Sequence, residues 1–202
     1  MRKIVVFTMV SLDGVMQAPG GPEEDPSGGF KYGGWVFPYM DESFGPVIGK
    51  ELSVPFDLLL GRKTYEIFAA YWPTQTGFIA DPFNKAKKYV ASSDAPLELT
   101  WEESILLDDD VVAKVKALKQ EDGPELQVHG SGKFLQTLWE NDLVDELRLR
   151  IYPVTLGPGK RLFAEGTIPA AFELIDSQVL PTGVILANYK RAGQVKTGTM
   201  GA

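Results

Sequence analysis

The sequence contains no cysteine, and this absence excludes several kinds of site at once. Disulfides, thiolate nucleophiles and zinc or iron–sulfur centres held by cysteine all require that residue. The only histidine is His129, which also excludes a metal site built from several histidines. We therefore expect no metal at the functional site.

Basic residues are scarce relative to acidic ones. The chain has 20 lysines and arginines against 27 aspartates and glutamates, so its formal net charge is −7 at pH 7. Proteins that bind nucleic acid usually present a basic face, and this balance argues against such a partner. A small anionic cofactor is still compatible with it where a few cations and backbone N–H groups gather locally.

Long hydrophobic runs are also missing. No stretch approaches the ~20 apolar residues that a membrane-spanning helix needs, so we expect no membrane partner. The N-terminal run over residues 4–10 is short, and Ser11 and Asp13 close it without the pattern of a cleavage site. It is interpreted as a buried first strand, and the expected location is the cytoplasm.

Length and composition indicate one globular domain. The chain has 202 residues, of which 44% are hydrophobic and 11% aromatic, enough for a sizeable core. We expect a single domain over residues 1–191. Residues 192–202 are expected to form a flexible tail.

Strand and helix patterns alternate along the chain. Short apolar runs typical of strands occur at 56–60, 89–91, 105–107 and 126–129, and helical spacing occurs at 64–72, 111–118 and 134–139. Residues 147–152 alternate in the manner of a half-exposed strand, and a turn at 181–183 joins two final strands into a hairpin. The pattern predicts an α/β fold: a mostly parallel sheet, helices on both faces and an antiparallel C-terminal hairpin. Ligands bind such sheets beyond the carboxyl ends of the strands.

The first candidate ligand motif is Gly61-Arg62-Lys63-Thr64, which follows a strand and opens a helix. N–H groups at a helix start bind anions, and glycine permits close approach of a phosphate. Arg62 and Lys63 supply positive charge, and the Thr64 hydroxyl can donate to phosphate. A plain helix cap with two solvated cations is the alternative.

Two further strand ends carry small polar residues. Ser92 and Ser93 follow the strand that ends at Ala91, and their hydroxyls could hold a 2′-phosphate, which would favour NADPH over NADH. Gly130-Ser131-Gly132 opens the next helix and suits a pyrophosphate. It is not a dinucleotide fingerprint of the G-x-G-x-x-G type, because Leu135 stands where the last glycine is required. It is not a P-loop either, because Gln127 stands where the first glycine is required.

Asp13, in the turn Ser11-Leu12-Asp13-Gly14, is the candidate catalytic residue. A carboxyl group at the mouth of the sheet can orient a substrate or deliver the proton that accompanies a hydride. An ordinary Asp-Gly turn is an equally good interpretation.

The stretch 19–34 is rich in glycine and proline and is expected to be a loop, either a lid over a pocket or a disordered insertion. Four aromatic residues are candidates for a slot that binds a planar substrate, with a place in the core as the alternative: Trp35, Phe44, Tyr65 and Phe68.

Together these motifs resemble the RibD C-terminal-domain branch of the dihydrofolate reductase superfamily. The resemblance rests on S-L-D-G, G-R-K-T-Y-E, the serine pair, G-S-G and the segments 143–147 and 153–157, and it spans about residues 3 to 190. It implies a central sheet of about eight strands with NADPH across the carboxyl ends. It also implies the following cofactor contacts: Gly61, Arg62, Lys63, Thr64, Ser92, Ser93, Gly130, Ser131 and Gly132. Asp13 would face the substrate, the loop 19–34 would close over the nicotinamide, and a homodimer is expected. Without cysteine, the chain cannot perform the zinc-dependent deamination to which this domain is often fused.

The resulting hypothesis is an NADPH-dependent oxidoreductase that transfers hydride to a small heterocyclic or sugar-linked substrate. Dihydrofolate reduction, or pyrimidinone reduction as in riboflavin synthesis, is one alternative. A catalytically silent NADPH-binding sensor or assembly protein is another.

Overall fold

The computed structural model describes residues 1–93, 96–164 and 167–200. The strands are β1 (Ile4–Ser11), β2 (Phe56–Gly61), β3 (Lys88–Ala91), β4 (Ser104–Leu107), β5 (Glu125–Val128), β6 (Glu146–Tyr152), β7 (Phe172–Val179) and β8 (Ile185–Arg191). The α-helices are α1 (Phe44–Leu52), α2 (Arg62–Tyr71), α3 (Ala80–Lys85), α4 (Val111–Gln120) and α5 (Gly132–Glu140). Short 3₁₀ turns occur at Ser27–Gly29, Phe37–Tyr39 and Trp72–Thr74.

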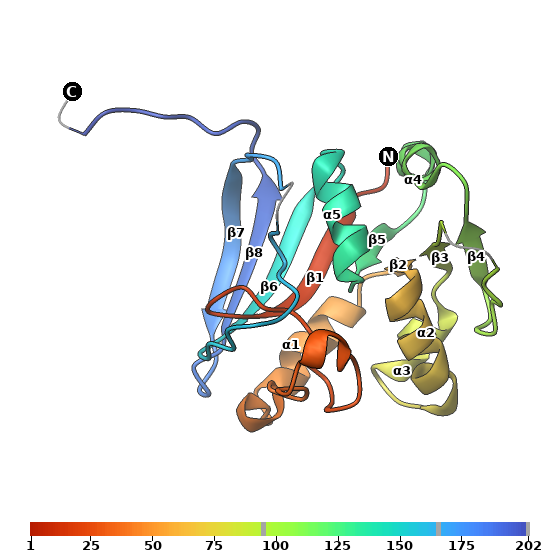
Figure 1. Cartoon of the computed structure of the whole chain (residues 1–202), viewed down its shortest axis with the longest axis horizontal. Coiled ribbons are helices and arrows are strands. Elements are labelled where there is room, and N and C mark those ends of the chain that lie inside the picture. Colours follow the sequence, from red (N-terminus) through yellow and green to blue (C-terminus); the bar gives the residue numbers. More distant parts are fainter. Residues whose placement is uncertain (94–95, 165–166, 201–202) are drawn as a thin grey trace.

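The strands form one eight-stranded sheet in the order β4-β3-β2-β5-β1-β6-β8-β7 (Figure 1). The pairings from β4 across to β6 are parallel, whereas β8 is antiparallel to both β6 and β7. The predicted mostly parallel sheet with a C-terminal antiparallel hairpin is therefore confirmed. Asp110 caps the start of α4, because its side chain accepts a hydrogen bond of 3.0 Å from the Ala113 amide.

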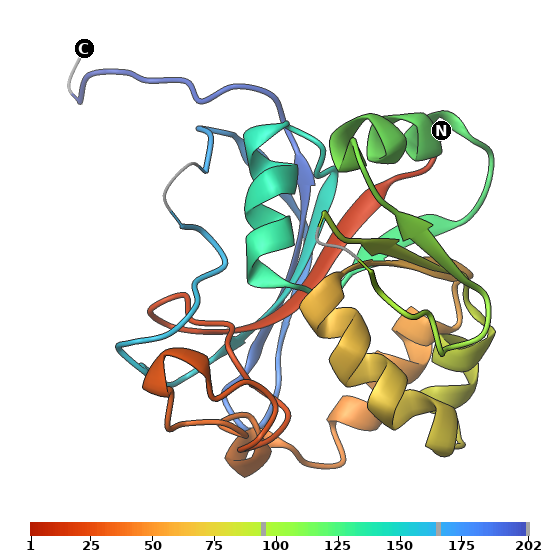
Figure 2. The same cartoon turned by 45° about the vertical axis from the view of Figure 1, so that its right-hand side comes forward.

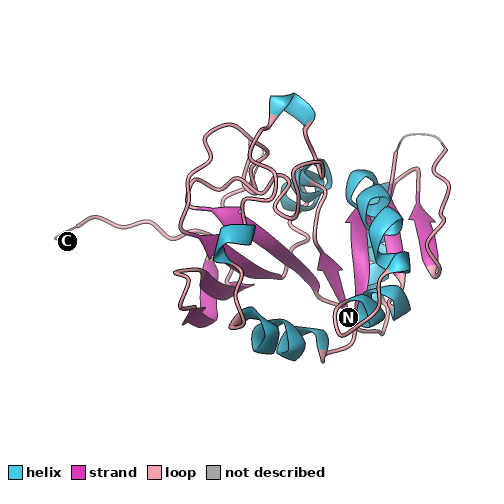
Figure 3. Ribbon diagram, turned by 90° about the horizontal axis from the view of Figure 1, so that it is seen from below, coloured by secondary structure: helices cyan, strands magenta, loops and turns pink. Residues whose placement is uncertain are grey.

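The direction of each crossover decides which face a helix covers. From β1 to β2 and from β2 to β3 the chain moves toward β4, whereas from β4 to β5 and from β5 to β6 it moves the opposite way. Because parallel crossovers are right-handed, α1, α2 and α3 cover one face, and α4 and α5 cover the other. Figure 3 shows helices on both sides of the sheet. The core agrees: Leu135 packs with Val6, while Tyr65 packs with Leu58 on the opposite face.

Two neighbouring strands are followed by helices that lie on opposite faces of the sheet. β2 continues into α2 and β5 continues into α5, and the two strands pair side by side. This divergence opens a crevice at the carboxyl ends of β2 and β5, which is where open α/β sheets bind ligands. Figure 2 shows α5 and α2 separating from the sheet at this point.

The prediction that residues 147–152 form a half-exposed strand is wrong for two of its side chains. Arg150 and Tyr152 are fully buried, although they alternate with leucines. Helix α1 covers this face of β6, and its Glu51 forms an ion pair with Arg150. The Arg150 guanidinium also lies 4.0 Å from the centre of the Phe7 ring. A partner for Arg150 that lies 99 positions away leaves no trace in the local pattern.

The stretch 19–34 is a loop as predicted, apart from the turn at Ser27–Gly29, and it is anchored to the body of the protein. Phe30 and Asp25 are buried, and the Lys160 ammonium lies 2.5 Å from Asp25 Oδ2. At the other end of the chain, residues 192–200 are exposed and extend away from the sheet (Figure 1). No helix among the described residues is long and apolar enough to cross a membrane.

Candidate functional site

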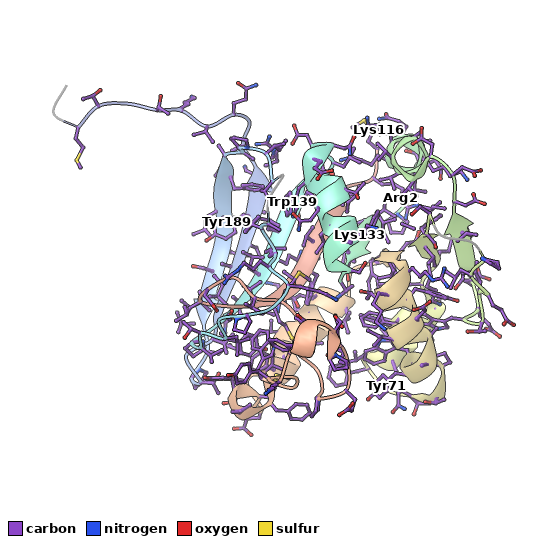
Figure 4. The ribbon with its side chains drawn as sticks, viewed as in Figure 1. Arg2, Tyr71, Lys116, Lys133, Trp139 and Tyr189 are labelled. Carbon is purple, nitrogen blue, oxygen red and sulfur yellow. The ribbon has the colours of Figure 1, made fainter. Side chains whose placement is uncertain are left out.

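A cavity of about 1140 Å³ lies at the carboxyl ends of the parallel strands. Its walls come from the ends of β1, β2 and β3, the residues after β5, the first turns of α2 and α5, and part of the segment 16–40. Figure 4 labels two of its lining residues. Lys133, at the start of α5, lies near one end of α2, and Tyr71 is the last residue at the other end of α2. The cavity exceeds the usual range of roughly 300–1,000 Å³ for small-ligand pockets, so it has room for a large ligand or for two.

Gly61 ends β2 and begins α2, and the three residues after it form the first helical turn. The first N–H groups of a helix lack partners within the helix, and the dipole makes this end attractive to anions. Arg62, Lys63 and Thr64 all line the cavity here, and Arg62 Nε donates to Glu66 Oε1 at 2.8 Å. The predicted anion motif thus opens into the cavity.

The second glycine-rich junction lies directly beside the first. The Gly61 amide donates a hydrogen bond of 3.1 Å to the Gly130 carbonyl. A Cβ on Gly130 would lie 2.5 Å from Thr64 Oγ1, and the backbone at Gly130 has a φ of +149°, so only glycine fits. Gly130, Ser131 and Gly132 also line the cavity, and the Gly130–Ser131 peptide is cis. The two junctions therefore form one continuous rim.

Ser92 and Ser93 lie on the same wall. The Ser92 amide donates to the Leu107 carbonyl at 3.1 Å, which extends the β3–β4 pairing past the end of the strand. Ser92 is buried and Ser93 is exposed, and both line the cavity together with Asp109 and Asp110. All nine residues predicted to contact the cofactor are thus brought together.

The wall nearest the sheet is aromatic and includes the only histidine. The His129 ring centre lies 5.0 Å from that of Phe7 and 6.0 Å from that of Phe68, and all three residues line the cavity. Burial, assisted by the charges of Arg150 and Arg148, lowers the pKa of His129 to about 3. The imidazole is therefore neutral near pH 7, with Nε2 3.3 Å from Gln127 Oε1. This environment suits a structural histidine rather than a proton shuttle.

Three of the four aromatic residues predicted to form a substrate slot lie in the core instead. The Trp35 indole donates to the Gln17 carbonyl at 2.8 Å, and both Trp35 and Phe44 pack on Tyr152. The Tyr65 hydroxyl accepts from the Trp101 amide at 3.1 Å. Only Phe68 lines the cavity. Sequence spacing cannot separate a core aromatic from a pocket aromatic, because both follow the same periodicity.

Asp13 does not line the cavity, and the structure gives its carboxylate another role. Oδ1 accepts from the Ser11 hydroxyl at 2.6 Å and from the Leu156 amide at 3.1 Å, and Oδ2 accepts from the Gly157 amide at 2.8 Å. The Ser11 hydrogen bond above all, helped by the two amides, lowers the pKa of Asp13 to about 2. Such a group holds no proton near neutral pH, which argues against the predicted delivery of a proton by Asp13. Its hydrogen bonds instead fasten the turn to residues 156–157.

The structure also reveals cavity carboxylates that the sequence reasoning missed. Glu24 and Asp25, on the loop 19–34, line the cavity, and so does Lys160, which pairs with Asp25. Burial raises the pKa of Glu24, although the Gly20 amide donates to Glu24 Oε2 at 2.6 Å. The run P-E-E-D within the loop was the available signal, but nothing local shows which carboxylate turns inward.

The sheet order and the crevice between β2 and β5 define an α/β protein of the dihydrofolate-reductase-like fold. The chain belongs to the RibD C-terminal domain family, whose model matches residues 2–186. It is similar to two uncharacterised proteins of Bacillus subtilis (strain 168). YyaP is 25% identical over 197 residues, which cover 93% of this chain and 94% of YyaP, and YwjB is 26% identical over 191 residues, which cover 95% and 99%.

Three solved structures share the fold. A protein of Shewanella sp. PV-4 described as a riboflavin biosynthesis protein has a TM-score of 0.66 at 22% identity, over 94% of this chain and 99% of that one. A pyrimidine reductase-like protein of Corynebacterium diphtheriae has a TM-score of 0.62 at 15% identity, over 95% and 92%. Dihydrofolate reductase of Enterococcus faecalis, complexed with NADP(H) and RAB-propyl, has a TM-score of 0.59 at 14% identity, over 94% of this chain and 96% of that one. Family and fold together support a reductase-type function.

Proposed function

We propose that this protein is a reductase that uses NADPH to reduce a small, planar substrate. The observation that carries the proposal is the rim at which the β2–α2 and β5–α5 junctions meet through the Gly61–Gly130 hydrogen bond. Two helix starts, small residues and nearby cations converge there, which is the chemistry that binds a phosphorylated dinucleotide.

The residues on this rim fit the parts of NADPH. Arg62, Lys63 and Thr64 would hold phosphate groups at the start of α2. Ser92 and Ser93 would approach the 2′-phosphate. The pyrophosphate would be bound by three residues of the second junction: Gly130, Ser131 and Gly132. The glycine at 130 fits this role because a side chain there would collide with Thr64 at the rim.

When bound, NADPH supplies the hydride, and the protein's own groups supply binding, orientation and exclusion of water. The aromatic wall of Phe7, Phe68 and neutral His129 offers an apolar surface for planar rings. The loop 19–34 contributes Pro19, Gly20 and Glu24 to another part of the cavity wall. A ligand in contact with both parts of the wall would be shielded from solvent by them, which strengthens polar contacts inside the cavity.

Calorimetry with NADPH near pH 7 and at low salt tests the proposal, with NADH as the matched ligand that lacks the 2′-phosphate. We expect NADPH to bind at least about tenfold more tightly, a difference of roughly 1.4 kcal/mol. Absence of NADPH binding would refute the cofactor assignment. Oxidation of NADPH, followed at its nicotinamide absorbance with dihydrofolate and with an aminopyrimidinone as acceptors, then separates these reactions from each other. Binding without turnover of any acceptor would favour the silent sensor.

A further inference from the structure

We propose that Asp109 limits the preference of the cavity for NADPH over NADH, because its carboxylate lies beside the serine pair that would approach the 2′-phosphate. This inference rests on the proposed function and deepens it. It assigns a role to a residue outside the glycine-rich junctions and the serine pair that form the rim.

The cavity differs in exposure between its two sides. β1 and β3 lie on either side of the β2–β5 pair in the sheet (Figure 1). On the β1 side the wall is enclosed, because its residues Thr8, Met16 and Ala18 are buried. On the β3 side it is open, because Ser93 and Asp109 are exposed. Hydride transfer benefits from exclusion of water, so we assign the nicotinamide to the enclosed side and the adenosine to the open side.

The pairing of β3 with β4 places Asp109 next to the serines. Ala91 pairs with Leu107 at the ends of these parallel strands, and the Ser92 amide donates to the Leu107 carbonyl at 3.1 Å. Two residues beyond this pair, the two chains reach Ser93 and Asp109, and both residues line the cavity. Paired strands run about 5 Å apart, so a phosphate held by the serine hydroxyls would have its charge close to the Asp109 carboxylate.

The carboxylate of Asp109 is not engaged by the protein, unlike those of its two neighbours. Asp108 forms an ion pair with Lys114, and the Asp110 side chain accepts a hydrogen bond from the Ala113 amide at the start of α4. Among the described residues, no side chain or amide forms a hydrogen bond or an ion pair with the Asp109 carboxylate. Its negative charge is therefore available to a ligand in the cavity.

The two cofactors differ at the group that Asp109 would meet. In NADH this group is the ribose 2′-hydroxyl, which can donate a hydrogen bond to a carboxylate, as it does to acidic residues in other dinucleotide sites. In NADPH it is a phosphate, which a carboxylate repels. Arg62, Lys63 and the serine hydroxyls favour the phosphate and Asp109 opposes it. The preference for NADPH is then smaller than the same rim would have without this charge.

The backbone at Asp109 permits a substitution that removes only the charge. Its φ is +52°, in the left-handed region that aspartate and asparagine adopt more readily than most residues. Asp109→Asn therefore keeps the backbone conformation and nearly the same shape. Asp142, just after α5, has a φ of +51°, is exposed and does not line the cavity. Asp142→Asn is the matched control, with the same backbone conformation and the same change in net charge.

Calorimetric titration of the wild type and both variants with NADPH and with NADH measures the ratio of the two dissociation constants. We expect Asp109→Asn to raise the preference for NADPH about fivefold, the upper end for two charges that interact near solvent. Asp142→Asn should leave the preference within about twofold of the wild type. An unchanged or smaller preference in Asp109→Asn, or an equal rise in both variants, overturns the inference.

Adenosine 2′-monophosphate, which lacks the nicotinamide and the pyrophosphate, separates this inference from the proposed function. If NADPH binds to none of the three proteins but this nucleotide binds more tightly to Asp109→Asn than to the wild type, the proposed function fails and the effect of Asp109 remains. If NADPH binds and the preference does not rise in Asp109→Asn, the inference fails while the cofactor assignment stands. Absence of binding of all the nucleotides overturns both.

Discussion

Gly61 and Ser131 lie so close together that no side chain fits on Gly61. A Cβ placed there would collide with Ser131 Oγ and would come within 2.8 Å of Phe134 Cβ. The glycine is required by space and not by backbone conformation, because its φ of −75° is open to any residue. The close approach of Gly61 to Ser131 keeps the β2–α2 and β5–α5 junctions together at the crevice.

Replacing Gly61 with alanine should therefore damage the rim. We expect Gly61→Ala to reduce the free energy of unfolding by about 1–3 kcal/mol through overpacking. The affinity for NADPH should fall at least tenfold, since moving the two junctions apart misaligns their amides. Urea unfolding and calorimetry measure the two effects. Gly49→Ala in α1 is the control: nothing lies within 4 Å of its added Cβ, so it should leave binding unchanged and stabilise the helix by up to about 1 kcal/mol.

Lys63 should contribute to cofactor affinity through its charge. We expect Lys63→Ala to weaken NADPH binding about tenfold at low salt, and the loss to shrink as added salt screens the interaction. Lys116, a lysine of α4 that does not line the cavity, is the matched control, and Lys116→Ala should bind NADPH like the wild type. Equal losses in the two variants would indicate a general effect of net charge.

Asp13 should stabilise the fold in a pH-dependent manner. Its pKa is about 2 in the folded protein, below the ordinary value of 3.8, so its contribution is present above pH 3.8 and is lost as the pH falls toward 2. At pH 7 we expect Asp13→Asn to lower the free energy of unfolding by about 1 kcal/mol. The difference between the two proteins should disappear near pH 2. Chemical denaturation at several pH values measures it, and a constant difference down to pH 2 would contradict the assigned role.

His129 should not titrate in the physiological range. As the only histidine, it gives a single set of imidazole signals in a proton NMR spectrum. We expect these signals to stay constant between pH 5 and pH 8, because the folded pKa lies near 3. Free histidine in the same sample should titrate with a midpoint of about 6.5. A midpoint above 5 for the protein signal would show that His129 is accessible to protons.

Removal of Glu51 alone from the Glu51–Arg150 ion pair should strongly reduce the free energy of unfolding. Arg150 has a side chain only 2% exposed, and Glu51 is 14% exposed, so the removal of Glu51 leaves a buried guanidinium without its counter-charge. We expect Glu51→Ala to reduce the free energy of unfolding by about 3–5 kcal/mol. Glu173→Ala removes one partner of the exposed Lys190–Glu173 pair and should change it by less than about 1 kcal/mol. Urea unfolding of both variants tests the contrast.

Features encoded by neighbouring residues could be predicted from the sequence. The alternation of strands and helices follows from local hydrophobic spacing, and the glycine-rich junctions at 61 and 130–132 follow from the small residues that a close approach requires. The parallel sheet then places both junctions at the same edge. For this reason the predicted cofactor rim is assembled in the structure from three separate stretches of chain.

Tertiary structure alone decided what each polar or aromatic side chain faces. Asp13 turns to the amides of Leu156 and Gly157, and Arg150 turns to Glu51, although the spacing of both suggested exposure to a ligand or to solvent. Glu24 lines the cavity while Glu23 beside it points outward. These outcomes depend on contacts between residues far apart in the chain, and the energy of such contacts has no counterpart in local periodicity.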